Sequence, residues 1–298
     1  MSGVATVYDG NGVQTRTAVA IPGPAGSKVP GAPTGVVFNA TTDFAVTPGQ
    51  PAKYIFATED GTIAAWDSGA AAVLKVDLSA LGTVYKGLAL GSSSKKNYLY
   101  ATNFNAGRVE VFDANFAPVA LAGSFTDPNL PAGFAPFNIQ NIGGKLYVTY
   151  AKPDAAKHDD VSGPGNGYVS VFDPNGTFVK RLVSQGPLNS PWGVVLAPAG
   201  FGGFGGALLV SNFGDGLINA FNPATGAWLG ALRDGSGKAL AIDGLWSLSF
   251  GNGTKAGDTH TLYFTAGIAG GGTVEDHGLF GSIVPVASVT ANTTEGVQ

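Results

Sequence analysis

The chain alternates between short apolar runs and polar turns, and one pair of runs recurs along the whole sequence. Each pair has an apolar run, a polar turn with glycine, and an alternating run that usually closes on an aromatic residue and Asp or Asn. The copies are AKYIFATEDGTIAAWD (52–67), NYLYATNFNAGRVEVFD (97–113), KLYVTY…GYVSVFD (145–173), ALLVSNFGDGLINAFN (207–222) and TLYFTAG…HGLFGSI (261–283). Alternation of period two between glycine turns predicts β-strands, and we find no 3.6-residue periodicity that would predict helices.

Each pair also follows another apolar run, and most pairs precede a more polar one. The preceding runs are APTGVVFNA (32–40), VYKGLALG (84–91), APFNIQNIG (135–143), SPWGVVLAP (190–198) and GLWSLSFG (244–251). Measured between equivalent aromatic residues, the repeat is 46, 60 and 49 residues long, from Trp66 to Phe112, Phe172 and Phe221. Four short strands in a unit of about 40–50 residues are typical of a propeller blade. We therefore predict an all-β fold, a β-propeller with four-stranded antiparallel blades.

The two ends of the sequence set the expected number of blades. Residues 3–22 align with the third and fourth strands of a unit only, and five full or nearly full units follow. We predict a six-bladed plan with an incomplete N-terminal blade, in a single domain over residues 1–298. The expected blades are 1–30 (partial), 31–83, 84–132, 133–187, 188–240 and 241–290, with a tail at 291–298. Either the C-terminal tail, VPVASVTANTTEGVQ, helps to complete the ring or, as we expect, an N-terminal half-blade is missing from this chain. An incomplete ring would expose strand edges to another chain.

Composition narrows the function classes. Gly is abundant at 46, charged residues are only 12%, hydrophobic residues are 44%, and the net charge is −4 with no basic cluster. These values argue against a disordered chain and against nucleic acid as a partner. The absence of cysteine excludes disulfides and thiolate metal sites. No apolar run is long enough for a membrane span, and no signal peptide is visible in this chain.

The loops that join second to third strands, and fourth to first strands, gather at one mouth of a propeller's central channel, where ligands usually bind. A lysine that enters an apolar inner strand needs a partner, which makes Lys86 conspicuous, and a nearby carboxylate is the expected one. Two tryptophans at repeat-equivalent positions either stack on a ligand or fill space between the blades. The predicted ligand-binding residues are Lys86, Asn138, Trp192, Trp246, Glu59, Asp60 and Asp215.

Two of the three histidines lie beside acids in equivalent loops, in KHDD and EDH. Imidazole with carboxylate suits a divalent metal (Zn, Mn, Fe or Ca) or acid–base chemistry, and the alternative is that both histidines are solvated or brace their loops. The predicted metal ligands are His158, His277, Asp159 and Asp276. The catalytic candidates are His158, His277, Lys86 and Asp160.

Several long stretches resemble an uncharacterised family of exported bacterial six-bladed propeller proteins, some of which carry a C-terminal sorting anchor. The stretches include FATEDGTIAAWD, GPLNSPWGVVLAPAGFG and NFGDGLINAFNP. The resemblance implies a six-bladed ring and an extracytoplasmic location, secreted or periplasmic. It implies no activity.

Three functions follow from these observations. The first is a binding module that presents its loop face to a carbohydrate, a peptide or an envelope protein. The second is a metal-assisted hydrolase or lyase with its site at the channel mouth. The third is a scaffold that pairs, or forms an oligomer, through an open blade edge. A propeller fold is compatible with all three.

Overall fold

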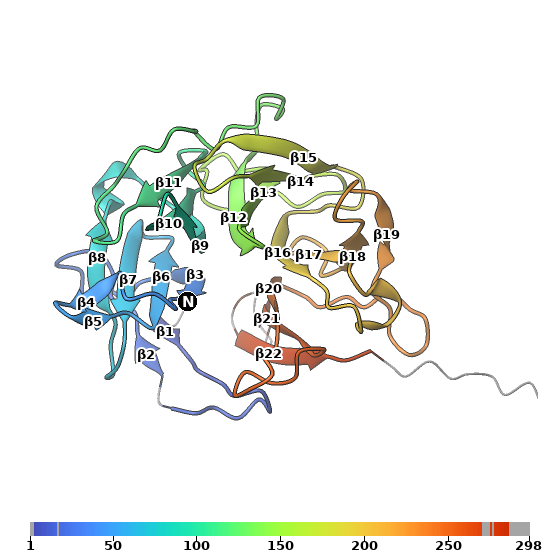
Figure 1. Ribbon diagram of the computed structural model, residues 1–298, viewed down its shortest axis with the longest axis horizontal. Helices are drawn as coiled ribbons and strands as arrows, with labels where there is room; N and C mark the ends of the chain where they lie inside the picture. The colour runs from blue at the N-terminus through green and yellow to red at the C-terminus, as the bar shows by residue number, and fades with distance from the viewer. Residues whose placement is uncertain (1–2, 17, 270–274, 276, 286–298) are drawn as a thin grey trace, which may run out of the picture.

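The computed structural model describes residues 3–16, 18–269, 275 and 277–285, and its sheets form a ring (Figure 1). Every pairing between two named strands is antiparallel. The described residues contain no α-helix, only the 3-10 turns η1 (Ser79–Leu81) and η2 (Gly202–Phe204). The predicted all-β propeller is therefore confirmed. Among these residues no helix has the length and hydropathy to span a membrane.

The ring has five blades. Three are four-stranded, and they consist of β3 (Pro33–Phe38), β6 (Tyr54–Thr58), β7 (Thr62–Trp66) and β8 (Val73–Asp77); β12 (Ala135–Ile142), β13 (Lys145–Ala151), β14 (Tyr168–Phe172) and β15 (Phe178–Ser184); and β16 (Pro191–Leu196), β17 (Leu208–Asn212), β18 (Ile218–Phe221) and β19 (Trp228–Ala231). Two are three-stranded, and they consist of β9 (Tyr85–Ser93), β10 (Lys96–Asn103) and β11 (Arg108–Phe112), and of β20 (Leu245–Phe250), β21 (Leu262–Ile268) and β22 (His277–Ile283). A small hairpin, β4 (Ala45–Thr47) and β5 (Gln50–Pro51), extends the first blade.

The six-bladed plan is wrong for the described chain. The N-terminal segment forms only β1 (Val4–Ala5) and β2 (Val19–Ala20), which pair with each other in a separate two-stranded sheet. Two residues per strand bury too little surface to make a blade. The fourth strand predicted for the second blade is also absent, because only an isolated bridge joins Phe112 to Pro118. Proline has no N–H to continue that ladder.

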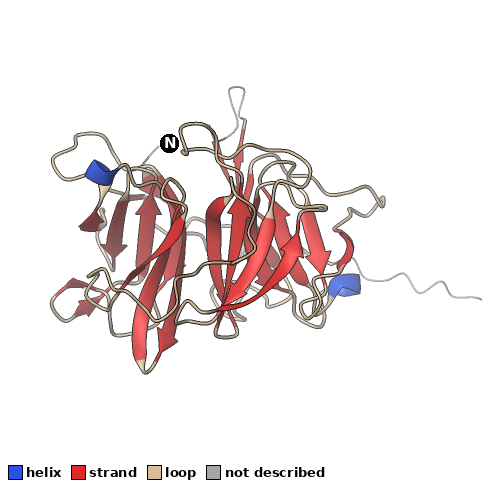
Figure 2. Ribbon diagram, turned by 90° about the horizontal axis from the view of Figure 1, so that it is seen from above, coloured by secondary structure: helices blue, strands red, loops and turns tan. Residues whose placement is uncertain are grey.

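The core lies between successive blades. The inner strands pack on one another in the order β3, β9, β12, β16 and β20, and Figure 2 shows the strands of the blades standing side by side with loops at both ends. Strands in the middle of a blade are covered on both faces, so β7 and β14 are buried at every residue. The alternation predicted for these third strands therefore does not separate a buried face from an exposed one, and their polar residues Thr62 and Ser170 are buried too.

The N-terminal hairpin joins the last blade to the first. The ring of Tyr8 stacks on that of Phe280 at 5.1 Å, and the Tyr263 hydroxyl donates to the carbonyl of Gly10 at 2.7 Å. On its other side the hairpin contacts the first blade, where the backbone N–H of Ala20 donates to the carbonyl of Ala70. The ring is thus closed by a hairpin where the other blade junctions are closed by inner strands.

Candidate functional site at the channel mouth

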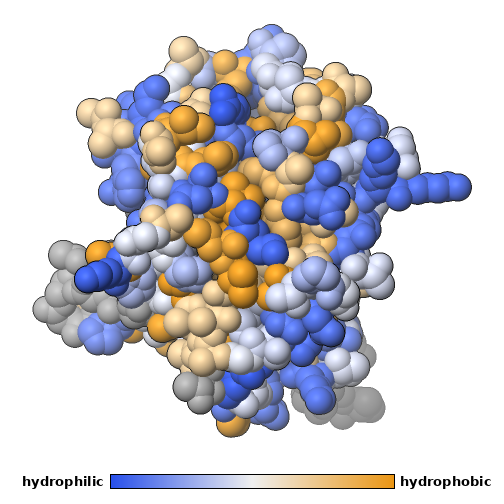
Figure 3. Space-filling model, turned by 90° about the vertical axis from the view of Figure 1, so that its left-hand side faces the viewer, coloured by the Kyte–Doolittle hydropathy of each residue, from blue (hydrophilic) through white to orange (hydrophobic). Residues whose placement is uncertain are grey.

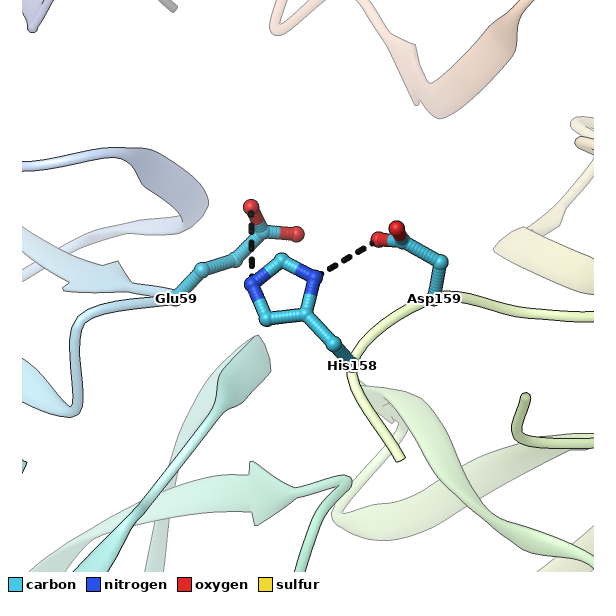
Figure 4. A group of neighbouring side chains, drawn as sticks. All are labelled: Glu59, His158 and Asp159. Carbon is cyan, nitrogen blue, oxygen red and sulfur yellow. Dashed lines mark hydrogen bonds and ion pairs between the residues drawn. The ribbon is translucent and has the colours of Figure 1, made fainter. Parts of the chain in front are cut away.

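A cluster of charged side chains occupies the mouth of the ring. Lys86 is the second residue of the inner strand β9, while Glu59 follows β6, and His158 and Asp159 belong to the long loop between β13 and β14. These three elements come from three consecutive blades. Figure 4 shows the imidazole of His158 between the carboxylates of Glu59 and Asp159.

Lys86 and Glu59 form a buried ion pair that crosses the junction between the first two blades. The Lys86 side chain is 2% exposed and that of Glu59 is 8% exposed, and the ammonium group donates to Oε1 of Glu59. The ammonium also lies 5.8 Å from the ring centre of Phe104 and 6.0 Å from that of Phe137. A buried lysine is tolerated only with such partners, and Glu59 is the carboxylate that the sequence argument required.

The long loop is folded tightly enough to fix His158. Asp154 accepts a hydrogen bond from the backbone N–H of His158 at 2.9 Å and donates its own N–H to the carbonyl of Asp159 at 2.8 Å. Nδ1 of His158 lies 2.9 Å from Oδ1 of Asp159, and Nε2 lies 4.0 Å from Oε2 of Glu59. Because Nδ1 is paired with a carboxylate, Nε2 is the nitrogen left to meet a ligand.

Burial raises the pKa values of two carboxyl groups at this mouth. Burial, followed by repulsion from Glu59, raises the pKa of Glu275 above its usual range. Burial also raises the pKa of Asp160, although hydrogen bonds from serine hydroxyls and the charge of Lys86 oppose the shift. A cation placed beside these groups would favour their ionised forms and lower both pKa values.

Three of these side chains could hold a metal ion. Glu59, His158 and Asp159 each offer a ligand atom, and the three atoms lie within 4.8 Å of one another. The 4.0 Å between Nε2 and Oε2 is too long for a hydrogen bond and close to the spacing of about 3.3–3.5 Å between two ligands of one tetrahedral ion. The pairing of His158 with Asp159 resembles the carboxylate–histidine arrangement that orients metal ligands.

His277 does not belong to this metal-capable group. It is the first residue of β22, is exposed, and pairs in register with Ile268. Asp276, the fourth predicted ligand, lies outside the described residues. Glu59 completes the group with His158 and Asp159, in the role that the sequence predicted for the second histidine.

The aromatic residues of the mouth pack mainly against one another. Trp192 is 4% exposed, and its ring lies 4.8 Å from that of Phe137 and 4.4 Å from that of Trp246. Trp246 is half-buried and also packs at 4.4 Å on Phe213. Trp192 is therefore part of the core in this structure, and Trp246 is the tryptophan with surface left for a ligand.

The other predicted ligand-binding residues hold the scaffold. Asp60 accepts the N–H of Ala32 at 2.6 Å, at the start of the first blade. Asn138 is buried and donates to the carbonyl of Trp192 at 3.0 Å. Asp215 accepts hydrogen bonds from the side chain of Asn189 and from a backbone N–H within its own loop. Each of these side chains thus makes at least one structural hydrogen bond.

The structure adds residues that sequence reasoning missed. The ring of Phe104 walls the Lys86 side chain, and Phe213 supports Trp246. Both follow an asparagine at the end of the second strand of a blade, in TNFN and SNFG. This shared Asn-Phe pair is the signal that could have identified them.

No family model matches the sequence. Among curated proteins it is similar to "Uncharacterized protein R648" of Acanthamoeba polyphaga mimivirus, with 36% identity over 78% of this chain and 59% of that protein. It is also similar to "Uncharacterized protein L690" of the same virus, with 34% identity over 80% of this chain and 64% of that protein. The chain spans about three fifths of the length of these two relatives.

These relatives are viral, so the resemblance to an exported bacterial family is wrong. The extracytoplasmic location was implied only by that resemblance, and it stays a prediction.

Two solved structures are similar in fold. A chain of the nidogen/laminin complex superposes with a TM-score of 0.52 at 17% identity, covering 89% of this chain and 84% of that one. Penicillium chrysogenum alpha-L-arabinanase, solved with arabinobiose, superposes with a TM-score of 0.51 at 13% identity, covering 84% and 76%. Identities this low show the fold alone, and that fold serves both a complex between proteins and a carbohydrate enzyme.

Proposed function

We propose that this protein is a binding module whose site is the acidic channel mouth, and that its ligand carries positive charge. The observation that supports the proposal is the imbalance of charge around Lys86. The ammonium group is already paired with Glu59, while Asp159, Asp160 and Glu275 add three further carboxyl groups nearby. An amino sugar or a basic peptide would offset the burial that raises the pKa of Asp160, and the burial and carboxylate repulsion that raise the pKa of Glu275.

The walls of the mouth fit such a ligand. Trp246 presents part of its ring beside Phe213, and an aromatic face favours contact with a sugar ring or a cationic group. The carboxylates accept hydrogen bonds from hydroxyl and ammonium groups. The site is built mainly on loops that strands β6, β13 and β21 anchor, which is the usual arrangement for binding surfaces on rigid scaffolds.

A matched pair of oligosaccharides tests the proposal. Oligomers of glucosamine and the same oligomers fully N-acetylated differ in charge but share a sugar backbone. We expect calorimetry to detect binding of the charged form, weakened about tenfold by Asp160→Asn, which removes one carboxylate. Oligolysine and its acetylated form provide the same comparison for a peptide. Equal binding of charged and neutral forms, or binding of neither pair, would contradict the proposal.

A second candidate is a metal-assisted hydrolase or lyase, and the placement of Glu59, His158 and Asp159 favours it. A metal there would supply Lewis-acid activation of a bound substrate. Equilibrium dialysis with Zn²⁺, Mn²⁺ and Ca²⁺ tests it, beside the double variant Glu59→Gln/His158→Ala and the control His277→Ala. About one ion per chain, lost only in the double variant, would support a metal centre. No uptake by the unaltered protein would remove this candidate.

A further inference from the structure

An apolar cleft of about 370 Å³ lies at the junction between the last and the first blade. Its walls are the N-terminal hairpin, strands β3, β6 and β7 of the first blade, and strands β21 and β22 of the last blade. Val36 of β3 is 57% exposed and Leu279 of β22 is 37% exposed. Figure 3 views the molecule from the side of the first blade and shows apolar side chains gathered in a central band of this face. No charged side chain lines the cleft among the described residues.

The N-terminal hairpin has the same turn as the one that follows the third strand in two other blades. Oδ1 of Asp9 accepts the N–H groups of Asn11 and Val13, both at 2.9 Å. Asp113 and Asp173, which follow the third strands of the second and third blades, each accept the equivalent pair of N–H groups at the same distance. The hairpin is therefore built as third and fourth strands. The cleft beside it lies where a blade has its first and second strands.

At closed junctions a buried hydroxyl ties one blade to the inner strand of the next. Thr102 accepts the N–H of Gly87 at 2.7 Å and donates to the carbonyl of Phe137 on β12 at 3.0 Å. Ser211 makes the same two bonds, accepting from β16 at 2.8 Å and donating to β20 at 2.7 Å. At these junctions the neighbouring inner strand thus supplies the carbonyl that accepts the hydrogen bond from the hydroxyl.

Thr265 holds the equivalent position in the last blade and faces the cleft. Its hydroxyl lies 3.3 Å from the N–H of Ser247 and 2.7 Å from the hydroxyl of the same residue. Among the described residues no inner strand of a following blade accepts from it, and Thr265 is exposed where Thr102 is fully buried. A hydroxyl built to meet a strand carbonyl therefore opens into the apolar cleft.

We propose that this cleft is a docking site for a β-hairpin of another polypeptide, with two short, apolar and uncharged strands. One strand of the hairpin pairs with the free edge of β1 and the other lies against β3, as β9 lies against β12. The backbone of that strand supplies the carbonyl for Thr265. Main-chain bonds along an open edge and apolar side chains in a groove are the two components of strand addition.

The side chain of Ser247 is compatible with a docked strand. Ser247 of β20 is equivalent to Gly87 of β9 and Gly193 of β16, where the lack of a side chain allows close approach of the next inner strand. In the third blade, however, the equivalent residue is Asn138. Asn138 does not block β16 and donates to the carbonyl of Trp192 on it. A small polar side chain at this place can therefore serve a neighbouring strand.

A hairpin taken from this chain is a suitable probe. Residues 84–104 contain β9 and β10, which are joined by a two-residue turn with positive φ at Ser94 and Lys95, and such turns favour hairpins in isolation. A fluorescent peptide of this sequence carrying Lys86→Met, which removes the charge from its inner strand, is titrated with the 298-residue protein, beside a scrambled peptide. We expect micromolar binding by the hairpin alone, weakened about tenfold by Val36→Asp and by Thr265→Val. Leu81→Asp, at a side chain 73% exposed outside the cleft, should leave binding unchanged.

Circular dichroism first establishes that each variant is folded. The proposal is overturned if folded protein does not bind the hairpin, or if the cleft variants bind it as well as the unaltered protein. Sedimentation tests whether a second copy of this chain is the occupant. Self-association that is lost in Val36→Asp would show that the cleft is a dimer interface and would overturn the proposal of a hairpin. Native mass spectrometry tests for a small apolar molecule, and a retained ligand lost in Val36→Asp would likewise overturn the proposal.

Discussion

Four junctions between blades are closed by inner strands, and the fifth is closed by the N-terminal hairpin. At each of the four, a side chain donates to a backbone carbonyl of the next inner strand, and the donors are Thr34, Thr102, Asn138 and Ser211. The inner strands β9, β12 and β16 are mostly buried, whereas β3 and β20, which border the fifth junction, have only one and two buried residues. The same repeat thus behaves as core or as surface, depending on whether a neighbour covers it.

The largest effect is expected where a closed junction carries charge. Lys86→Met leaves Glu59 buried without its partner, and breaking a buried ion pair from one side costs about 3–5 kcal/mol of unfolding free energy. Urea denaturation of the variant measures this cost. The double variant Lys86→Met/Glu59→Gln removes both charges and should recover most of the loss. A single variant as stable as the unaltered protein would show that the pair is not buried as described.

Close approach of inner strands predicts the next effect. A Cβ at Gly193 would lie 2.9 Å from the backbone nitrogen of Leu248 and 2.5 Å from the Ser211 hydroxyl. Gly193→Ala should therefore destabilise the protein by about 1–3 kcal/mol in urea titrations. The comparable change Ser247→Thr, which also adds one methyl group but at the open junction, should alter stability by less than about 0.5 kcal/mol. Equal costs at the two positions would mean that the fifth junction is as crowded as the others.

Removing the threonine hydroxyl at a closed junction and at the open junction should give a smaller difference in stability. Thr102→Val leaves the N–H of Gly87 and the carbonyl of Phe137 without their buried partner, at a cost of about 1–2 kcal/mol. Thr265→Val should cost less than about 0.5 kcal/mol, because its side chain is exposed. Thermal unfolding of both variants in parallel compares the two. A larger loss at Thr265 than at Thr102 would reverse our assignment of the open junction.

The smallest effect concerns pH, and it separates the mouth from the connection between the second and third blades. Although burial opposes it, a bidentate pair with Arg181 lowers the pKa of Asp127, so this carboxylate stabilises the fold above about pH 3.8 and the stability is lost as the pH falls through the lowered value. The raised pKa values of Asp160 and Glu275 act in the opposite sense, and their contribution is lost as the pH rises through them. Asp127→Asn should reduce the loss of unfolding free energy at low pH, and Asp160→Asn should not. The same loss at low pH in both variants would contradict these assignments.

Much of the fold can be predicted from the sequence, because the apolar runs of the repeat coincide with buried strands. Apolar runs such as those around Leu99 and Leu209 identify strands covered on both faces. The number of blades does not follow, because the hairpin after Val4 carries the turn and the aromatic residue of a blade without forming one. An alignment based on third and fourth strands counts every such hairpin as a blade, although a blade also needs first and second strands.

The candidate site follows from the sequence only in part. Lys86 is conspicuous because a charge within an apolar strand must be paired, and this requirement holds wherever the loops lie. The proximity of His158 to Glu59 depends on how a long loop folds over a neighbouring blade, which no local pattern encodes. His277 illustrates the limit, since it matches His158 in loop and context but begins a strand and lies outside the metal-capable group.

Hydrogen–deuterium exchange with and without the peptide of residues 84–104 tests the central claim about the fifth junction most directly. Our account predicts that the peptide slows exchange at the free edge of β1 and along β3, while amides at the four closed junctions exchange as before. Protection spread evenly over all five junctions, or none at β1, would contradict the claim that this junction is built to receive a strand.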